Sequence, residues 1–371
     1  MIEKIMEMIE NFGIQGEFEG YEIFKSGHIN TTCLVKMREG DDLKKYVLQK
    51  INSYVFKKPD EVMENISNVT EFVRRKIEKS GQSADRKVLK FLPATDDKYY
   101  VNDADGDFWR IYEFVDKSIT FDSTDDLTVL SETGKAFGEF QNYLSDYPSE
   151  TLHDIIPNFH NTPNRYKIFR ETIDRDPVGR AESVEGIISD YLQLETCVSN
   201  MQKMLENGEL QLRVTHNDTK CNNVLFDEDT REHLCVIDLD TVMPGLVGHD
   251  FGDAIRFAAN TCAEDEKNTD NVKIDLDKFD AFAQGFIGQV GKSLTQKEID
   301  TLPLGAITMT TECGLRFLTD YIDGDNYFGI KYPEHNLDRA KCQLALAQDM
   351  VKNYDQMKEI VSKHSQDLTM E

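Results

Sequence analysis

The chain has 371 residues, of which 39% are hydrophobic and 10% aromatic. This length favours two lobes of unequal size, and the apolar content is sufficient for a proper core. The formal net charge of −26 argues against a nucleic-acid or anionic-membrane surface, because the phosphate groups of such partners would be repelled. An anionic substrate would therefore need a metal ion to accompany it.

Neither a targeting segment nor a membrane span is recognised in the sequence. The N-terminal residues MIEKIMEMIENFG alternate charged and apolar residues at helical spacing and lack the apolar run of a secretory signal. No apolar run is long enough to cross a bilayer. The seven cysteines are scattered without paired spacings, which favours structural thiols over disulfides or zinc ligands. We expect a cytoplasmic protein with no nucleic-acid, membrane or obligate protein partner.

The first 115 residues predict a small lobe that is rich in strands. A turn at Gly27 separates the first two strands, and Pro59 begins a helix with one apolar face. The sequence DADGD predicts a hairpin turn between the last two strands. The expected elements are, in chain order, the N-terminal helix, two strands within 21–37, a strand at 44–52, a helix at 59–78, and strands on either side of the turn 103–107.

Beyond Val115 the sequence has the periodicity of long helices. The helices are expected at 126–146, 183–206, 276–290, 296–322 and 337–363. The only strand-like interruption of this region is the segment 213–240. We expect an N-terminal nucleotide-binding lobe, 1–115, and a C-terminal catalytic and substrate-binding helical lobe, 116–371, joined by a tight hinge.

The segment 213–240 carries an ordered set of polar residues. It contains His216-x-Asp218-x-Lys220-x-x-Asn223, and Asp238 follows an apolar run. Phosphoryl transfer requires a carboxylate for the attacking hydroxyl, a cation near the transferred group and oxygen ligands for magnesium. The set supplies all of these parts.

Each residue of the set has a specific expected role. Asp218 is the candidate base, and Lys220 would offset the charge that develops on the transferred phosphoryl group. Asn223 and Asp238 are hard oxygen ligands suited to Mg²⁺. If the strand continues through Asp240, this residue could be a second ligand or support the first. Any one of these residues alone could equally serve a turn, so the complete set carries the prediction.

Two other motifs in the helical region are misleading. A literal Asp-Phe-Gly at 250–252 opens a helix-like run far from Asn223, so we interpret Asp250 as a helix cap or a support for the catalytic loop. The sequence GFIGQVGKS at 285–293 has phenylalanine where a P-loop needs its first glycine. We interpret it as the end of a helix.

Several motifs together resemble those of the aminoglycoside phosphotransferase and choline kinase family, and within it the N-acetylhexosamine 1-kinases. They span nearly the whole chain and include GHINTT (27–32), THNDTK (215–220), IDLDT (237–241) and KYPEHN (331–336). The resemblance implies an α+β, protein-kinase-like bilobal fold, with a small antiparallel sheet and one helix in the N-lobe and a larger, mainly helical C-lobe. It also implies ATP-dependent phosphorylation of the anomeric hydroxyl of GlcNAc or GalNAc, with Mg²⁺ as cofactor and sugar and ATP as small-molecule partners.

The resemblance also implies further site residues. Asp218 would face the sugar hydroxyl, and other substrate contacts would come from His28, Phe257, Arg316 and Tyr327. The nucleotide would contact Gly27, Lys50, Glu113 and Val115, the last two through backbone groups of the hinge. Strand alternation admits either Lys50 or Gln49 on the phosphate side, and Glu64 and Glu71 are both available as a helix partner.

The four substrate residues also have structural alternatives. His28 could cap a turn, Phe257 could belong to the core, Arg316 could pair with Asp320 on one helix, and Tyr327 could be an ordinary half-buried tyrosine.

Other functions compete with the sugar 1-kinase. A kinase of the same fold could act on an aminoglycoside, choline, homoserine or methylthioribose, and the acidic run 263–271 would suit a cationic acceptor, although it is also typical of a solvated loop. A glycosyltransferase would use Asp238 and Asp240 for a metal but leaves 216–223 unexplained. A pseudokinase is disfavoured by the intact set of polar residues.

Overall fold

The computed structural model describes residues 1–24 and 30–370. Gly27 and His28, which are expected to contact phosphate and substrate, lie outside these described residues.

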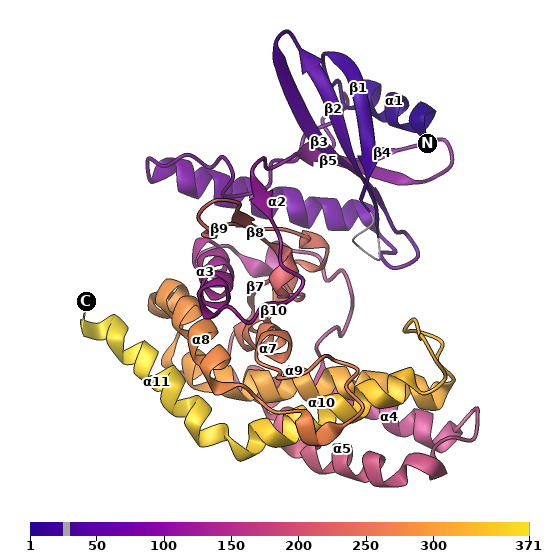
Figure 1. Cartoon of the computed structure of the whole chain (residues 1–371), viewed down its shortest axis with the longest axis vertical. Helices are drawn as coiled ribbons and strands as arrows, with labels where there is room; N and C mark the ends of the chain where they lie inside the picture. Colours follow the sequence, from indigo (N-terminus) through magenta and orange to yellow (C-terminus); the bar gives the residue numbers. More distant parts are fainter. Residues whose placement is uncertain (25–29, 371) are drawn as a thin grey trace.

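The N-terminal residues form a five-stranded antiparallel sheet with the order β1-β2-β3-β5-β4 (Figure 1). The strands are β1 (Glu17–Ile23), β2 (Thr31–Glu39), β3 (Asp42–Ile51), β4 (Val101–Asn102) and β5 (Phe108–Glu113). The predicted strands and the hairpin are confirmed. In the hairpin turn, Asp103 Oδ1 accepts hydrogen bonds from the N–H groups of Asp105 (2.9 Å) and Asp107 (3.0 Å).

Two helices pack on opposite faces of this sheet. The helix α1 (Ile2–Asn11) buries Ile5 and Met8 in a small core with Leu48 and Trp109 of the sheet. The helix α2 (Pro59–Lys79) lies between the sheet and the helical part of the molecule (Figure 1). Its predicted apolar face is buried in the same core as the C-terminal helices. Proline is favourable at its first position, where a backbone N–H has no helical partner.

Strand alternation decides which side chains of β3 and β5 face α2. Leu48 and Trp109 face α1, so Lys50 and Ile111 do as well, while Gln49 and Arg110 lie on the other face and bond to each other (2.9 Å). Lys50 pairs instead with Asp107 at the hairpin (3.0 Å). Lys50 is therefore turned away from the face on which a phosphate contact is expected, and Gln49 takes that face.

Beyond residue 116 the chain is mainly helical. The helices are α3 (Leu127–Tyr143), α4 (Thr162–Arg175), α5 (Glu185–Val198), α6 (Asn200–Glu206), α7 (Val247–Ala258), α8 (Leu276–Val290), α9 (Gln296–Asp323), α10 (His335–Lys352) and α11 (Tyr354–Met370). The predicted helices at 126–146, 276–290 and 296–322 are confirmed.

Three features of the helical part differ from the prediction. The helix predicted at 183–206 is divided into α5 and α6 at Ser199, and the one predicted at 337–363 is divided into α10 and α11 at Asn353. At the second break, the carbonyl of Asp349 accepts both the side-chain amide (2.9 Å) and the backbone N–H (3.0 Å) of Asn353. The helix α4 is absent from the prediction, although the side chain of Asn161 caps it.

The segment 213–240 contains three short strands, and two further short strands pair with them. β7 (Arg213–Thr215) pairs with β10 (Met243–Gly245), while β8 (Val224–Asp227) pairs with β9 (His233–Val236) and with β6 (Ser118–Ile119). The N–H of Ile237 bonds the carbonyl of Asn223 (2.9 Å). This contact brings Asn223, at the end of the His216–Asn223 set, close to Asp238.

Helices approach closely where glycine replaces a larger residue. A Cβ on Gly252 of α7 would lie 2.2 Å from the carbonyl oxygen of Gly305 on α9, and one on Gly285 of α8 would lie 2.0 Å from that of Ser131 on α3. Gly252, the last residue of the literal Asp-Phe-Gly, therefore serves helix packing. The helix α8 ends at Val290, which confirms the interpretation of 285–293 as a helix end.

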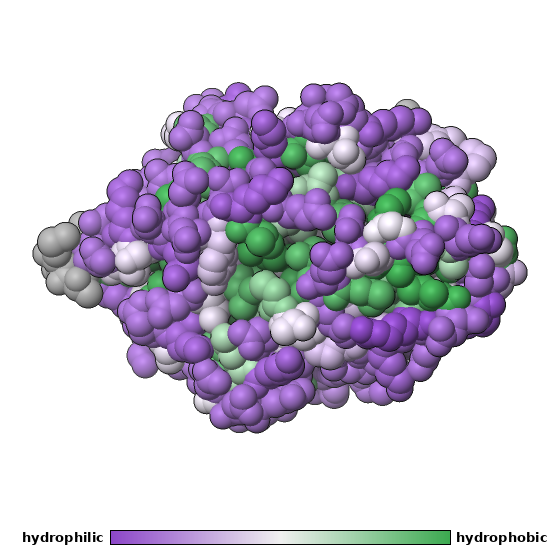
Figure 2. Space-filling view, turned by 90° about the horizontal axis from the view of Figure 1, so that it is seen from below, coloured by the Kyte–Doolittle hydropathy of each residue, from purple (hydrophilic) through white to green (hydrophobic). Residues whose placement is uncertain are grey.

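The face built by the lower helices of Figure 1 is mostly hydrophilic, with hydrophobic residues gathered toward its middle (Figure 2). Among the described residues, none of the helices combines the length and the hydrophobicity that a bilayer crossing requires. All seven cysteines are free thiols, as their scattered spacing predicts.

Candidate active site

The loop 216–220 carries Asp218 and Lys220. It links the strand β7 to the turn Cys221–Asn223. Asn217 has a φ of +65°, a left-handed conformation that asparagine adopts more readily than most residues. Its side-chain Nδ2 donates to the carbonyl of Thr241 (2.9 Å), which fixes the loop to the segment after β9.

Asp250, at the start of α7, supports this loop. Its carboxylate accepts hydrogen bonds from the backbone N–H groups of His216 (2.9 Å) and Asn217 (2.8 Å) and from Gln141 Nε2 (2.7 Å). Burial raises the pKa of Asp250, and these donors favour the charged form against it. Of the two roles considered for Asp250, the structure places it as a support for the loop.

Asp218 lies between a cation and an amide. Lys220 Nζ is 2.7 Å from its Oδ1, and Asn223 Nδ2 is 3.1 Å from its Oδ2. Burial alone would lower the pKa of Lys220, but the charge and hydrogen bond of Asp218 outweigh it and raise that pKa. The carboxylate is therefore held in one orientation with a positive charge beside it.

Asn223 and Asp238 are the two candidate metal ligands. The Asn223 amide nitrogen faces Asp218, and among the described residues no side-chain donor bonds its oxygen or the Asp238 carboxylate. Asp238 reaches solvent, yet the surrounding protein and then the charges of Asp240 and Asp218 raise its pKa to about 6. A divalent cation would relieve this repulsion.

This pair fits magnesium better than a metal bound by many side chains. Within the described ranges, no group of three or more His, Cys, Asp or Glu side chains is arranged to hold a metal ion. Mg²⁺ keeps several waters and uses one or two protein carboxylates together with substrate phosphates. One amide and one carboxylate are consistent with that preference.

Asp240 does not continue the strand beside Asp238. The strand β9 ends at Val236, Asp238 is left-handed with a φ of +60°, and Asp240 lies in the turn η4 (Leu239–Thr241). The buried Asp240 carboxylate forms an ion pair with Arg110 and accepts a hydrogen bond from Asn30 Nδ2 (2.6 Å). Because both of its oxygens have partners, Asp240 supports the turn and is not placed as a second ligand.

The residues expected to contact the nucleotide do not all lie on the same face of the sheet. Glu113 ends β5, its side chain pairs with Lys90 (2.6 Å) and its backbone N–H donates to the Lys90 carbonyl (3.0 Å), so its own carbonyl is the group left for the nucleotide. Val115 accepts a hydrogen bond from Ser118 Oγ at its carbonyl (2.6 Å), whereas its N–H bonds no other described residue. The backbone of the hinge therefore has a free donor, while Lys50 is on the other face of the sheet.

The expected helix partners of a third-strand lysine are not arranged for that role. Glu64 bonds the imidazole of His153 (2.9 Å) and is exposed, and Lys50 bonds Asp107. Neither Glu64 nor Glu71 forms an ion pair with Lys50 in the described part of the chain.

Three expected substrate residues lie on the surface of the C-terminal part beyond Lys220. Phe257 is exposed beneath the cations of Lys220 (5.4 Å) and Arg256 (4.0 Å), so it does not belong to the core. Arg316 lies 5.9 Å from the ring of Tyr327, which is 72% exposed. The structural alternative for Tyr327, an ordinary half-buried tyrosine, is wrong.

The pairing considered for Arg316 with Asp320 is not formed. Asp320 instead accepts hydrogen bonds from the backbone N–H groups of Asn326 (2.9 Å), Tyr327 (2.8 Å) and Phe328 (2.9 Å). These bonds order the loop that presents Tyr327. Asn336 of KYPEHN donates to the same carboxylate (2.9 Å), which gives that motif a structural role.

A buried polar pair lies behind Arg316. Glu312 accepts hydrogen bonds from His160 Nδ1 (2.9 Å) and Thr162 Oγ1 (2.8 Å). Burial would raise the pKa of Glu312, but His160 outweighs it and the pKa falls to about 2. Arg165 is also near, and the charge of Arg316 contributes to lowering its pKa. This side of the site therefore contains fixed charges with cations facing outward.

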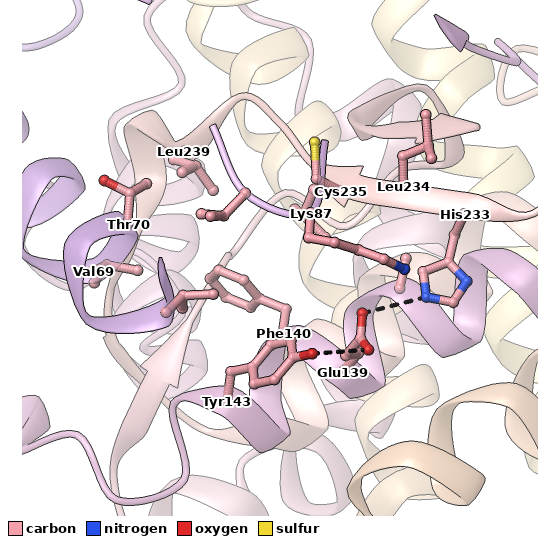
Figure 3. Close-up of a pocket in the computed structure, with 14 residues that line it drawn as sticks. Val69, Thr70, Lys87, Glu139, Phe140, Tyr143, His233, Leu234, Cys235 and Leu239 are labelled. Atoms are coloured by element: carbon pink, nitrogen blue, oxygen red, sulfur yellow. Dashed lines mark hydrogen bonds and ion pairs between the residues drawn. The ribbon is translucent and has the colours of Figure 1, made fainter. Parts of the chain in front are cut away.

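The pocket drawn in Figure 3 is separate from this chemistry. It lies between α2, α3 and β9 and is lined by apolar side chains together with Lys87, Glu139, Tyr143 and His233. None of the predicted site residues lines it.

Arg110, Asn217 and Asp253 belong to the site environment and were not among the predicted site residues. Asp253 accepts the N–H of Thr219 (3.1 Å). Arg110 could have been noticed as a charged residue between Trp109 and Ile111 within a strand, since a buried charge needs a partner. The left-handed conformation of Asn217 could not be predicted from the sequence beyond the preference of asparagine for it.

Comparison with known proteins identifies the class of this chain. Residues 21–279 match the model of the phosphotransferase enzyme family, so the chain belongs to this family and is a phosphotransferase. The family expected from the motifs is thereby confirmed.

Several solved structures share the fold of this chain. They include the microcompartment-associated aminopropanol kinase (16% identity, TM-score 0.64, 95% of this chain and 98% of that chain). A choline kinase from Cryptosporidium parvum Iowa II has 16% identity, a TM-score of 0.56 and coverages of 96% and 97%. The GDP complex of aminoglycoside 2'-phosphotransferase-IIIa has 15% identity and a TM-score of 0.58, and the match covers 95% of this chain and 99% of that chain. The protein-kinase-like bilobal fold is confirmed.

Proposed function

We propose that this phosphotransferase transfers the γ-phosphoryl group of ATP to the anomeric hydroxyl of GlcNAc or GalNAc, releasing ADP and the sugar 1-phosphate. The observation that carries the proposal is the convergence of Asp218, Lys220, Asn223 and Asp238 at the ends of β7 and β9. The choice of acceptor rests on the resemblance of the motifs to N-acetylhexosamine 1-kinases.

The proposed reaction is a direct in-line transfer without a phospho-enzyme. Asp218 would orient the acceptor hydroxyl and accept its proton, because it is the carboxylate of the loop and is already held in one orientation. Lys220 would turn from Asp218 toward the developing charge on the phosphoryl group. Both residues are within one short loop, so the two roles are coordinated by the same backbone.

Asn223 and Asp238 would hold Mg²⁺, and the hinge backbone near Glu113 and Val115 would bind adenine. When bound, the ion neutralises charge on the nucleotide phosphates. The free N–H of Val115 supports the adenine contact, since a purine ring edge offers an acceptor to such a donor.

The charges around Arg316 favour a neutral, hydroxyl-rich acceptor over an amine. Arg316 has no carboxylate partner among the described residues and would repel a cationic acceptor, whereas Lys220 pairs with Asp218 and Arg256 with Asp253. The acidic run 263–271 does not oppose this, because Glu264 pairs with Arg256 (2.6 Å) and Asp265 with His335 (3.2 Å). Exposed Phe257 and Tyr327 would pack against the apolar face of a sugar ring.

An acceptor panel tests the proposal. The protein would be incubated with ATP, Mg²⁺ and one acceptor at a time from GlcNAc, GalNAc, choline, aminopropanol and an aminoglycoside, and ADP release would be followed. We expect turnover with an N-acetylhexosamine, and phosphorus NMR should place the phosphate on the anomeric oxygen. Turnover of an amine with no turnover of either sugar would refute the acceptor assignment.

A further inference from the structure

The third strand of the sheet does not supply a cation to the phosphate side. In protein kinases a lysine on this strand contacts the nucleotide phosphates. Here Gln49 occupies the face toward α2, and Lys50 bonds Asp107 on the opposite face. The cation on the α2 face comes instead from the neighbouring strand, where Arg110 of β5 lies beside Gln49.

Arg110 is fully buried and joins three parts of the molecule. Its Nε donates to Gln49 Oε1 of β3 (2.9 Å), and its Nη1 bonds the Asp240 carboxylate and lies 3.8 Å from Met63 Sδ of α2. The second oxygen of Asp240 accepts from Asn30 (2.6 Å). The turn η4 is therefore anchored to the N-terminal sheet by one guanidinium and one amide.

The other end of this turn is anchored to the catalytic loop. Thr241 Oγ1 donates to the carbonyl of His216 (2.7 Å), and the Thr241 carbonyl accepts from Asn217 (2.9 Å). Asp238 precedes the turn in a left-handed conformation, and within the described ranges no side chain bonds its carboxylate. Its direction is therefore set by the backbone on either side of it.

We propose that Arg110 is the positioning residue of the metal-binding turn: acting through Asp240, it holds Asp238 in place from the N-terminal sheet. The inference rests on the proposed function, in which Asn223 and Asp238 hold the metal. A planar guanidinium can bond Gln49 and Asp240 at the same time, whereas an ammonium group lacks that fixed fork.

The test measures ADP binding by calorimetry over a series of Mg²⁺ concentrations, without any acceptor. Two variants weaken the anchor while conserving volume or charge: Asp240→Asn and Arg110→Lys. We expect each to raise the Mg²⁺ concentration needed for half-maximal ADP affinity by about 10-fold or more, as is typical when a partner of a metal ligand is lost. Binding of ADP without Mg²⁺ should change little.

Trp109 provides a check on folding in the same samples. It is the one tryptophan of the sequence and lies next to Arg110, buried on the opposite face of β5. Unchanged Trp109 emission would show that the sheet is intact. Lys44→Met on β3, which removes an exposed ion pair with Glu39 of β2, is the matched control and should keep the wild-type Mg²⁺ dependence.

Three results would count against the inference in different ways. Wild-type Mg²⁺ dependence in both variants, with unchanged Trp109 emission, would overturn it. A raised Mg²⁺ requirement in Lys50→Met and not in Asp240→Asn would assign the task to Lys50 and overturn it too. ADP binding by the wild type that is independent of Mg²⁺ would instead refute the proposed metal pair itself. Failure of GlcNAc as an acceptor would leave this inference untouched.

Discussion

At the scale of single residues, Asp218 is held by its neighbours on the loop. Lys220 contacts one of its oxygens and Asn223 the other, so the loop fixes the carboxylate in one orientation. An asparagine at this position would keep the shape and lose the ability to accept a proton.

We therefore expect Asp218→Asn to lower kcat by about 10²–10⁴-fold, the usual contribution of a general base. The affinity for ADP with Mg²⁺ should stay close to that of the wild type, because Asn223 and Asp238 are unchanged. Steady-state kinetics measures the change in kcat, and calorimetry measures the affinity for ADP with Mg²⁺. Asp174→Asn, an exposed carboxylate on α4, is the control, and a fully active Asp218→Asn enzyme would contradict the assignment.

Arg316 is a half-buried cation among aromatic rings, without a carboxylate partner in the described chain. Removing the charge in Arg316→Met should raise the KM for the acceptor by about 10-fold, the loss expected for one hydrogen bond from a charged donor. The KM for ATP should not change. Arg175→Met, which breaks a surface pair with Asp323, serves as control. Equal effects on both KM values would indicate a structural role.

At the scale of elements, the crossing of α7 and α9 links helix packing to the catalytic loop. Gly252 allows the close approach, and Asp250 and Asp253 on the same helix support the loop. A displacement of α7 would therefore reach the backbone of Asp218.

Gly252→Ala is expected to lower the free energy of unfolding by about 1–3 kcal/mol, as overpacking does in well-packed cores, and to lower kcat as well. Urea unfolding and steady-state kinetics measure the two effects. Gly288→Ala, on the exposed face of α8 where an added Cβ meets nothing within 4 Å, is the matched control. It should stabilise the helix by about 0.5–1 kcal/mol, and equal losses in both variants would exclude the packing explanation.

A second pair of elements, α3 and β9, is joined by a histidine. His233 contacts Glu132 (2.6 Å) and Glu139 (3.4 Å), beside the pocket of Figure 3. Burial would lower the pKa of His233, but the hydrogen bonds and charges of the two glutamates outweigh it and raise that pKa. The resulting stability is fully present below the unfolded pKa of about 6.5 and is lost as the pH rises through the folded pKa.

His233→Gln should therefore lower the free energy of unfolding more at about pH 5.5 than at a pH above the raised folded pKa of His233, where the wild-type histidine has lost its charge. Urea unfolding of both proteins across this range gives the difference at each pH. Glu139→Gln should show the same trend more weakly, since Glu132 remains. A difference that does not vary with pH would show that the ion pair does not form.

At the scale of the whole molecule, the proposed nucleotide site draws on both lobes. The hinge near Val115 follows the sheet, and Asp238 lies in the helical part. Ligands that bind only the folded state stabilise it in proportion to their occupancy. Mg²⁺-ADP should therefore stabilise the two lobes together.

With ADP at 100 times its dissociation constant, we expect a stabilisation of about 2.7 kcal/mol, seen as a rise in Tm. In Asp238→Asn the part of this rise that depends on Mg²⁺ should disappear, so that the variant with Mg²⁺ matches the wild type with EDTA. Differential scanning calorimetry measures both. An Mg²⁺-dependent rise that persists in Asp238→Asn would remove this residue from the metal site.

Much of the architecture follows from local patterns of the sequence. The apolar face of α2, the alternation of β3 and β5 and the hairpin turn at 103–107 depend on residues close together along the chain, so they were predictable. The spacing within His216–Asn223 likewise indicated the phosphotransferase chemistry. The breaks at Ser199 and Asn353 were not predictable, because the apolar periodicity continues across them.

What the sequence by itself determined is therefore the order of most elements, the two-lobed class and the candidate residues of the loop 216–220. Only the tertiary structure decided that Gln49 and not Lys50 faces α2, that Asp250 supports the loop, and that Asp240 pairs with Arg110. Arg110 and Asp240 are 130 residues apart in the chain. Periodicity reports which face of an element is buried, whereas the partner of a buried charge depends on which distant elements pack together, and that is a property of the folded molecule.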